Sequence, residues 1–162
     1  MLEIKRFQEN DIDAVFKVQQ AAYLPLFEKY RDTESNPYME SREKVLQKYT
    51  REGTQGYVFL LDGEAVGAVR INLYPEYRSG RVSALCVHPM HQGKGIAQEA
   101  LFRIEQMHAD VRKWFLDTIL QEKGNCHLYE KIGYRQTGKT EKISDQMTLV
   151  FYEKKKQAEE NA

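Results

Sequence analysis

The sequence has few cysteines, no long apolar run and no excess of charge of either sign. Its two cysteines, Cys86 and Cys126, are too few for a disulfide framework, so we expect reduced thiols. No apolar run approaches about 20 residues and the first ten residues contain no apolar signal core, which argues against a membrane span and predicts a cytoplasmic location. Lys plus Arg number 24, as do Asp plus Glu, and this balance argues against nucleic acid or a membrane as a partner.

Internal repeats and linkers are also missing. Apolar residues make up 41% of the chain and charged residues 30%, as in ordinary globular domains. A chain of 162 residues is long enough for one domain with a sizeable core. We therefore predict a single domain over residues 1–152 and a charged, flexible tail over residues 153–162.

The spacing of apolar residues predicts a mixed α/β domain with the order β-α-α-β-β-β-α-β-α-β-β. Pro25 should kink or end the first helix, leaving residues 26–37 irregular. Asp62-Gly63 predicts a hairpin, so antiparallel strands come first and β-α-β crossovers follow. The sheet should therefore be mixed, largely antiparallel and flanked by helices. The predicted strands cover residues 2–7, 56–61, 65–73, 82–87, 114–120, 134–137 and 147–152, and the predicted helices start near residues 11, 41, 95 and 125.

After the strand at 82–87, the chain turns through two glycines into a helix. Gly93 and Gly95 leave backbone N–H groups bare, and a helix N-terminus adds unpaired donors and a partial positive charge. Lys94 adds a cation at the rim. These features predict an anion site suited to a pyrophosphate.

Other interpretations of this turn stay open, including a glycine-rich turn without a ligand. The string GxxxxGK[ST] of a P-loop is missing. The dinucleotide fingerprint GxGxxG lacks its third glycine, although Asp117 lies near the spacing of a ribose-binding acid. The turn also lies in mid-chain after antiparallel strands. A nucleotide-binding module is therefore the weaker alternative.

The string Gln92-Gly93-Lys94-Gly95-Ile96-Ala97 matches [QR]-x-x-G-x-[GA], and here the sequence resembles the GNAT superfamily of N-acetyltransferases. The preceding Leu85-Cys86-Val87-His88-Pro89 is similar to the family's fourth strand and its exit. The resemblance implies that the loop wraps the pyrophosphate of coenzyme A and that a bulge splays this strand from the next one. It also implies that pantetheine lies in the gap and that a backbone N–H of the strand holds the acetyl oxygen.

A second segment, Asn125 to Tyr134, resembles another part of this family. Asn125 then corresponds to a residue that hydrogen-bonds pantetheine, and Tyr129 to the general acid that protonates the departing thiolate. Their spacing puts both on one helix face. The alternatives are an N-cap for Asn125 and a packing role for Tyr129. The coenzyme-binding residues implied by the resemblance are Leu85, Cys86, Val87, Gln92, Gly93, Lys94, Gly95, Ile96, Ala97 and Asn125.

No general base is evident, although an alkylamine with a pKa of about 10 must lose a proton before it attacks. Similar enzymes often carry a Glu or His early on the fourth strand, where this sequence has Arg81 and Ser83. Ser83 alternates with Leu85 and Val87, so we expect it to face the acetyl-binding edge and hold a water. Arg81 should disfavour an ionised amine and could pair with an anionic part of the acceptor.

For several other residues near the predicted site, the sequence predicts no single role. Four carboxylates border the acceptor region of such folds, but no pattern selects one of them: Glu28, Asp32, Glu34 and Glu76. Cys86, His88 and His91 lack the partner pair of a zinc site, and Cys86 reads as a small buried hydrophobe rather than an acetyl-bearing nucleophile. Aromatic residues pack the first helix or line the acceptor pocket, namely Tyr23, Phe27 and Tyr30.

The sequence therefore predicts an N-acetyltransferase that moves the acetyl group of acetyl-CoA to a primary amine by direct attack, without a metal. Tyr129 and Ser83 are the predicted catalytic residues. The acceptor is a small-molecule or peptide amine, and a homodimer stays open. The alternative is a coenzyme A-binding sensor or regulatory module without turnover.

Overall fold

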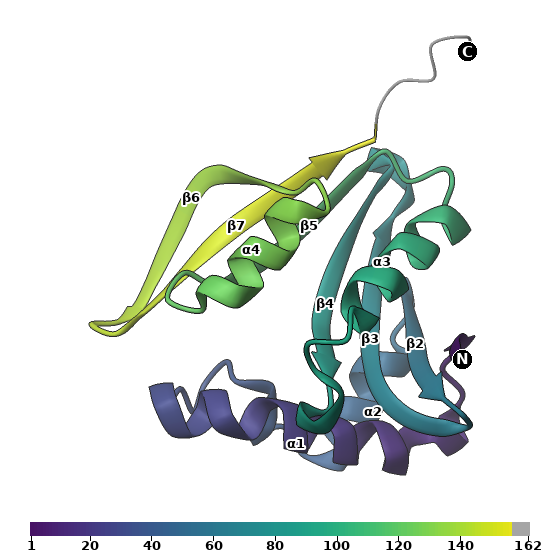
Figure 1. Cartoon of the computed structure of the whole chain (residues 1–162). Helices are drawn as coiled ribbons and strands as arrows, with labels where there is room; N and C mark the ends of the chain where they lie inside the picture. The colour runs from purple at the N-terminus through teal and green to yellow at the C-terminus, as the bar shows by residue number, and fades with distance from the viewer. Residues whose placement is uncertain (157–162) are drawn as a thin grey trace, which may run out of the picture.

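The computed structural model describes residues 1–156, which form a seven-stranded sheet flanked by helices (Figure 1). The strands are β1 (Leu2–Arg6), β2 (Thr54–Leu61), β3 (Glu64–Tyr74), β4 (Ser79–Val87), β5 (Lys113–Ile119), β6 (Arg135–Ser144) and β7 (Met147–Lys155). The α-helices are α1 (Ile12–Tyr30), α2 (Arg42–Thr50), α3 (Ile96–Met107) and α4 (Lys123–Lys131). This order of elements confirms the predicted one.

The strands lie in the order β1-β2-β3-β4-β5-β7-β6. Among these neighbours, β4 and β5 pair in parallel and the other pairs are antiparallel. The predicted mixed, largely antiparallel sheet is therefore confirmed. A dinucleotide-binding fold, which needs a parallel sheet, does not fit this topology.

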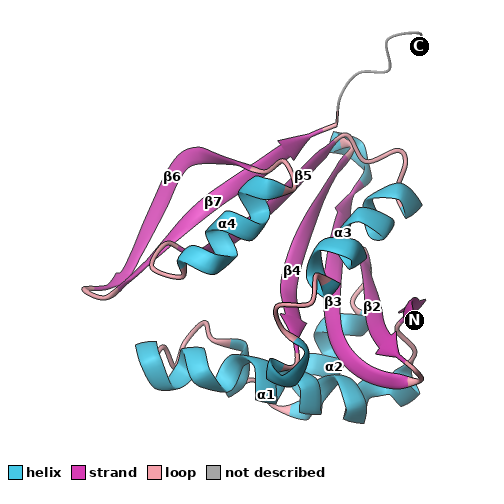
Figure 2. Ribbon diagram, in the orientation of Figure 1, coloured by secondary structure: helices cyan, strands magenta, loops and turns pink. Residues whose placement is uncertain are grey.

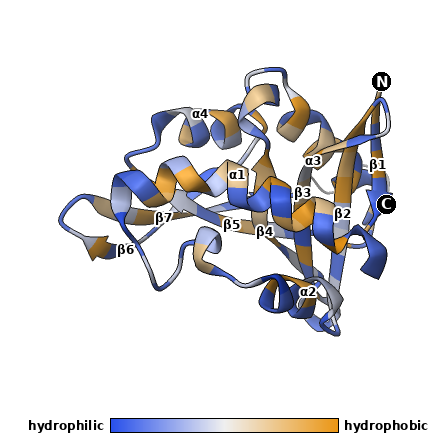
Figure 3. Ribbon diagram, turned by 90° about the horizontal axis from the view of Figure 1, so that it is seen from below, coloured by the Kyte–Doolittle hydropathy of each residue, from blue (hydrophilic) through white to orange (hydrophobic). Residues whose placement is uncertain are grey.

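Each face of the sheet is covered by one pair of helices (Figure 2). Helices α1 and α2 pack one face, where Val15 and Val45 meet Val58 and Ala68. Figure 3 shows α1 lying across this face of the sheet. Helices α3 and α4 cover the other face through a larger cluster, in which Ile104 is fully buried. Any cavity that opens through the sheet therefore has one helix pair on each side.

Backbone geometry accounts for three local features, of which the first, the predicted hairpin, is confirmed. In the β2–β3 hairpin, Asp62 has φ 51° and Gly63 has φ 84°, the left-handed pair that a tight turn requires. Ser41 caps α2 by accepting a hydrogen bond from Lys44 N at 3.1 Å. Gly133, with φ 104°, follows α4.

The prediction that residues 26–37 are irregular is wrong for the first five of them. Pro25 lies inside α1, which continues to Tyr30. Proline removes one backbone donor, and here the last turn is stabilised elsewhere. Arg31 N donates to Phe27 O at 2.8 Å, and the Phe27 ring stacks on Tyr38 with centroids 5.1 Å apart.

The predicted tail begins inside a strand. β7 continues to Lys155, which pairs with Lys113 of β5, and Glu153 forms an ion pair with Lys113 at 3.1 Å. Residues 157–162 of the predicted tail lie outside the described residues. Within the described part, no helix has the length and apolarity needed to cross a membrane.

Candidate active site

The site begins where β4 and β5 separate (Figure 1). The two strands pair only through Ser79 to Arg81 of β4 and Lys113 to Phe115 of β5. Beyond Arg81 a bulge changes the course of β4: its register with β3 shifts, and Ala84 adopts a φ of 50°. Bulges bend a strand and end its pairing, so the bulge and the splay implied by the sequence are both confirmed.

A cavity of about 800 Å³ occupies this gap and is open to solvent. It has a glycine-loop wall, made by residues 87–98 and α4, and a polar wall, made by residues 22–48, Arg70 and the first half of β4. All the predicted site residues line the cavity except Lys94, which is exposed outside it. The fold thus brings both sequence motifs, which lie some thirty residues apart in the chain, to one cavity.

The loop before α3 presents bare backbone. Gly93 and Gly95 have φ values of 79° and 77°, and a Cβ atom on either would point into open space. The amides of residues 93–98 make no backbone hydrogen bond to any residue of the described range 1–156. The first such bond of α3 runs from Glu99 N to Gly95 O at 3.0 Å. Consecutive free N–H groups at a helix N-terminus are the donor set that binds a pyrophosphate.

The free edge of β4 also exposes backbone groups to the gap. His88 N donates to Val66 O of β3 at 2.7 Å. In a strand, the backbone N–H and C=O groups of successive residues point to opposite sides. Since the N–H of His88 points to β3, the N–H and C=O of Val87 are directed away from β3. The Val87 carbonyl accepts from Gln92 Nε2 at 2.9 Å, and the Leu85 carbonyl accepts from the Tyr23 hydroxyl at 3.0 Å. The Val87 N–H is thus a donor toward the gap, without a partner strand.

On α4, Asn125 and Tyr129 both reach the cavity. The helix starts at Lys123, so Asn125 lies in its first turn and is not an N-cap. Tyr129 is 9% exposed, and its ring lies against Tyr134 with centroids 6.0 Å apart. Burial, and to a smaller extent the charge of Asp117, raises the pKa of Tyr129 well above its ordinary value, so its phenol is protonated at neutral pH. Within residues 1–156 its hydroxyl makes no hydrogen bond to another side chain.

Ser83 does not face the side that simple alternation predicts. It lies opposite Arg70, and Cys86 lies opposite Ala68. Arg70 and Ala68 are two residues apart on β3, so Ser83 shares a face with Cys86 rather than with Val87. The extra residue of the bulge reverses the alternation. Ser83 still lines the cavity, but from the polar wall.

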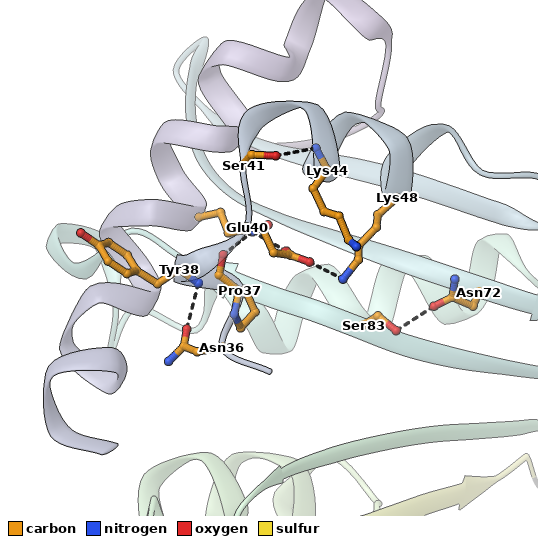
Figure 4. A network of polar contacts seen from close by, with 10 residues as sticks. Asn36, Pro37, Tyr38, Glu40, Ser41, Lys44, Lys48, Asn72 and Ser83 are labelled. Carbon is orange, nitrogen blue, oxygen red and sulfur yellow. Dashed lines mark hydrogen bonds and ion pairs between the residues drawn. The ribbon is translucent and has the colours of Figure 1, made fainter. Parts of the chain in front are cut away.

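The polar wall is built from paired groups (Figure 4). Ser83 Oγ donates to Asn72 Oδ1 at 2.7 Å. Lys48 forms an ion pair with Glu40, whose other oxygen accepts from Gln19 Nε2 at 2.9 Å. These side chains come from α1, α2, β3 and β4 and fix one another's positions.

Arg81 is already neutralised by a protein partner. Its guanidinium forms an ion pair with Asp117 of β5, across the last paired residues of the two strands. The expected pairing of Arg81 with an anionic part of the acceptor would have to compete with this ion pair, and it stays a prediction. Asp117 has no ribose-binding role in this topology and instead holds Arg81.

One of the four acids proposed from the sequence lines the cavity. Asp32 does so, and its carboxylate accepts hydrogen bonds from Glu34 N and Ser35 N, both at 3.1 Å. Glu28, Glu34 and Glu76 are exposed. Asp32 is therefore held by the turn that it caps.

A bridge joins the two walls at the end of α1. Glu122, just before α4, accepts hydrogen bonds from Lys29 Nζ at 2.7 Å and from the Tyr30 hydroxyl at 2.5 Å. Partial burial alone would raise the pKa of Glu122, but these two hydrogen bonds outweigh it and lower the pKa. Of the three aromatic residues of α1 singled out by the sequence, Tyr23 lines the cavity and Tyr30 anchors this bridge.

Cys86 behaves as the buried hydrophobe that the sequence predicts. It is 5% exposed and packs with Val58 and Ala68. Burial raises the pKa of its thiol to about 12, so it carries no thiolate at neutral pH. Among residues 1–156, no group of three or more His, Cys, Asp or Glu is placed to hold a metal ion.

Comparison with known proteins agrees with this geometry. Residues 23–134 match the acetyltransferase (GNAT) family, which covers more than half of the chain. The chain belongs to the GNAT family of acetyltransferases. Members of this family use acetyl-CoA as the acetyl donor. No curated protein matches the sequence significantly.

Solved GNAT structures share the whole fold at low sequence identity. A PaiA N-acetyltransferase of Thermoplasma acidophilum, in complex with coenzyme A, has a TM-score of 0.77 at 17% identity and covers 96% of this chain and 99% of its own. The ribosomal-protein-S18-alanine N-acetyltransferase of Escherichia coli has a TM-score of 0.79 at 14% identity, with 100% and 99% covered. A spermidine N-acetyltransferase chimera from Vibrio cholerae and hSSAT has a TM-score of 0.75 at 18% identity, with 95% of each chain covered.

The GNAT motifs in the sequence did not indicate the residues of the polar wall. Arg70 was missed, although a lone charge inside the apolar run from Ala65 to Leu73 is a signal for an inward-facing cation. Lys48 of the polar wall and Glu122 of the bridge were missed because their partners lie 8 and 93 residues away, in other elements. No local pattern encodes such pairings.

Proposed function

We propose that this GNAT enzyme transfers the acetyl group of acetyl-CoA to a primary amine of a small molecule or peptide by direct attack. The observation that carries the proposal is the cavity in the β4–β5 splay, which has bare loop amides at one end and the Tyr129 hydroxyl on its α4 side. Acetyl-CoA supplies the thioester. The protein binds and orients both reactants and moves protons.

The residues of the glycine-loop wall fit a coenzyme A molecule. The free amides of residues 93–98 bind the pyrophosphate, and no side chain of Gly93 or Gly95 stands in the way. Backbone groups of Leu85 to Val87 and the Asn125 amide hold the pantetheine. The Val87 N–H, directed into the gap, donates to the acetyl oxygen and stabilises the charge that develops there.

Tyr129 is the proton donor. Its raised pKa keeps the phenol protonated, and its hydroxyl has no competing protein partner among the described residues. It gives its proton to the sulfur as the thiolate departs. The packing of its ring against Tyr134 fixes its direction.

Deprotonation of the acceptor runs through water rather than a single carboxylate. Each carboxylate that lines the cavity already has protein partners: Asp32 accepts from two backbone amides, Glu40 from Lys48 and Gln19, Asp117 from Arg81, and Glu122 from Lys29 and Tyr30. Ser83, on the polar wall, is the group that we expect to hold the water. The rate should then rise with pH as more of the acceptor becomes free amine.

The test is direct. The protein is incubated with acetyl-CoA and a set of primary amines, and release of free thiol is followed. Thiol release that depends on both the amine and Tyr129 supports the transferase. Coenzyme A binding without thiol release for any amine contradicts it and would indicate the sensor that the sequence left as an alternative.

Two further predictions from the sequence stay predictions. The cytoplasmic location is to be checked by fractionating cells that express the chain. The homodimer is to be checked by sedimentation of the purified protein with and without coenzyme A.

A further inference from the structure

The cations that line the cavity from β3, β4 and α2 are not equivalent. Lys48 is paired with Glu40, and Arg81 is paired with Asp117. The Arg70 side chain lines the same cavity, but its guanidinium makes no hydrogen bond or ion pair with any residue in the range 1–156. A guanidinium carries five N–H donors, so Arg70 brings an uncompensated charge and an empty donor set.

Arg70 lies close to the point where chemistry takes place. It sits in the middle of β3, directly opposite Ser83 of β4, which comes just before the bulge. Facing residues of an antiparallel pair have Cβ atoms about 5 Å apart. Burial raises the pKa of both Cys86 and Tyr23, and the positive charge of Arg70 opposes this rise. The guanidinium therefore lies near the residues that flank the bulge.

The side of Arg70 that faces β2 is closed by an aromatic ring. Its neighbour on β2 is Gly56, and a Cβ atom there would come within 2.4 Å of the Tyr49 ring, which fills this space. The centroid of the same ring lies 5.9 Å from the Arg70 guanidinium carbon. Tyr49 is uncharged and does not neutralise the guanidinium.

We propose that the acceptor carries a carboxylate besides its amine, and that Arg70 binds this carboxylate. The inference rests on the proposed acetyl transfer and names the class of its substrate. A planar guanidinium and a carboxylate form two parallel hydrogen bonds, which orient as well as attract. One unpaired cation matches the single charge of a carboxylate, whereas a phosphate ester carries up to two charges.

The same charge discriminates against other amines and favours the reaction. A polyamine would bring a second cation next to Arg70 and has no group for its donors. A nearby positive charge also lowers the pKa of an alkylammonium, so the amine of a bound amino acid loses its proton more readily. Arg70 is thus a specificity-determining residue that touches the acceptor.

The experiment compares matched acceptors. The acceptors are amino acids with increasing distance between the amine and the carboxylate, and each is assayed beside the amide of the same compound. Each pair is tested with the wild type, Arg70→Gln, Arg70→Lys and the control Arg51→Gln. Arg51 is exposed outside the cavity. We expect at least one acid to exceed its amide in kcat/KM by about tenfold or more in the wild type and in the control. Arg70→Gln should abolish the preference mainly through KM, and Arg70→Lys should keep part of it.

The outcomes separate this inference from the proposed function. Turnover of amines with no acid preferred over its amide, or a preference unchanged in folded Arg70→Gln, overturns the role of Arg70 while the transferase stands. If no amine is acetylated, calorimetry of the same pairs on the coenzyme A complex decides. If an acid binds more tightly than its amide and Arg70→Gln loses this difference, the carboxylate site is supported, while the absence of acetylation contradicts the proposed turnover. Binding of no acid overturns the carboxylate site. If Arg70→Gln fails to fold, Arg70→Lys takes its place in each comparison, and the expected result is then a reduced preference for the acid, with an unchanged preference overturning the role of Arg70.

Discussion

The two walls of the cavity recognise ligands by different means. The glycine-loop wall offers backbone amides at residues 93–98, and the two glycines there keep side chains out of the way. Apart from Arg70, the charged side chains of the polar wall pair with other side chains, as Lys48 does with Glu40 and Arg81 with Asp117. Recognition by backbone amides suits a ligand that is always the same. A pair of side chains, in contrast, can be replaced together by another pair without altering the sheet.

The difference also decides what a mutation does. A change in the glycine-loop wall alters access to the backbone and should act on coenzyme affinity. A change in the polar wall leaves a partner charge unpaired, so it should act on the acceptor and on stability together. Tyr129, packed inside the α3–α4 core cluster, should act on the chemical step alone.

The largest effect should come from Tyr129→Phe. The ring stays and the proton is lost, so kcat should fall by about 10²-fold with coenzyme A affinity little changed. The matched control is Tyr134→Phe, which removes a hydroxyl from the neighbouring ring outside the cavity. Steady-state kinetics and calorimetry on both variants check this, and equal kcat values for Tyr129→Phe and the wild type would return Tyr129 to a packing role.

Gly95→Val should weaken coenzyme A binding at least tenfold, about 1.4 kcal/mol, because a branched side chain would fill the space in front of the loop amides. The fold should largely survive, although valine at φ 77° adds strain. Gly63→Val is the control: Gly63 has φ 84° and open space around it, in the distant β2–β3 hairpin. Calorimetry should show weaker binding only for Gly95→Val. Equal affinity in folded Gly95→Val would contradict the loop assignment.

The glycine-loop wall could be predicted from sequence because its information is local. Two glycines after a buried strand, followed by a helix, specify bare amides whatever the rest of the chain does. The order of helices and strands along the chain followed from the spacing of apolar residues and from the Asp62-Gly63 turn. The residues of the loop therefore carried both the family resemblance and the physical reason for it.

The polar wall could not be predicted because its information is not local. The bulge at Ala84, a residue with positive φ and no glycine, reversed the side on which Ser83 lies. Pro25 did not end α1, since contacts with other elements hold the last turn. The pairing of Arg81 with Asp117 depends on two strands meeting for only three residues. Each of these outcomes depends on tertiary contacts that spacing does not encode.

Replacing four acids by their amides, one at a time, tests whether any single carboxylate is the general base. For Glu28, Asp32, Glu34 and Glu76, we expect each loss in kcat/KM to stay below about 10²-fold, under the usual range for a positioned base. Asp32 should show the largest of these losses, since it caps the turn at Ser35 beside the cavity. Measured pH profiles should still rise with pH in all four variants. A variant that binds coenzyme A but has no activity would identify its residue as the base.

Ser83→Ala should have a smaller effect. It removes a neutral hydrogen bond to Asn72 and one partner of the water, so activity should fall about threefold. The solvent-exposed Ser41 provides a contrast: Ser41→Ala removes a helix cap and should lower stability without affecting kcat. Kinetics and thermal melting together check both variants. An unchanged kcat/KM in Ser83→Ala would exclude a water held by this hydroxyl.

The smallest effect should come from the bridge that joins the two walls. In Glu122→Gln the hydrogen bonds from Lys29 and Tyr30 lose their charged acceptor, and the melting temperature at pH 7 should fall by at most about 4 °C. Because folding lowers the pKa of Glu122, the stabilisation is present above the ordinary carboxyl pKa of about 4.3 and disappears as the pH falls through the lowered value. The difference between wild type and variant should therefore shrink between about pH 5 and pH 3. Asp145→Asn, which removes an exposed ion pair with Lys142, is the control and should leave the melting temperature unchanged. A difference that persists undiminished at pH 3 would show that the bridge stabilises by packing and not by the charge of Glu122.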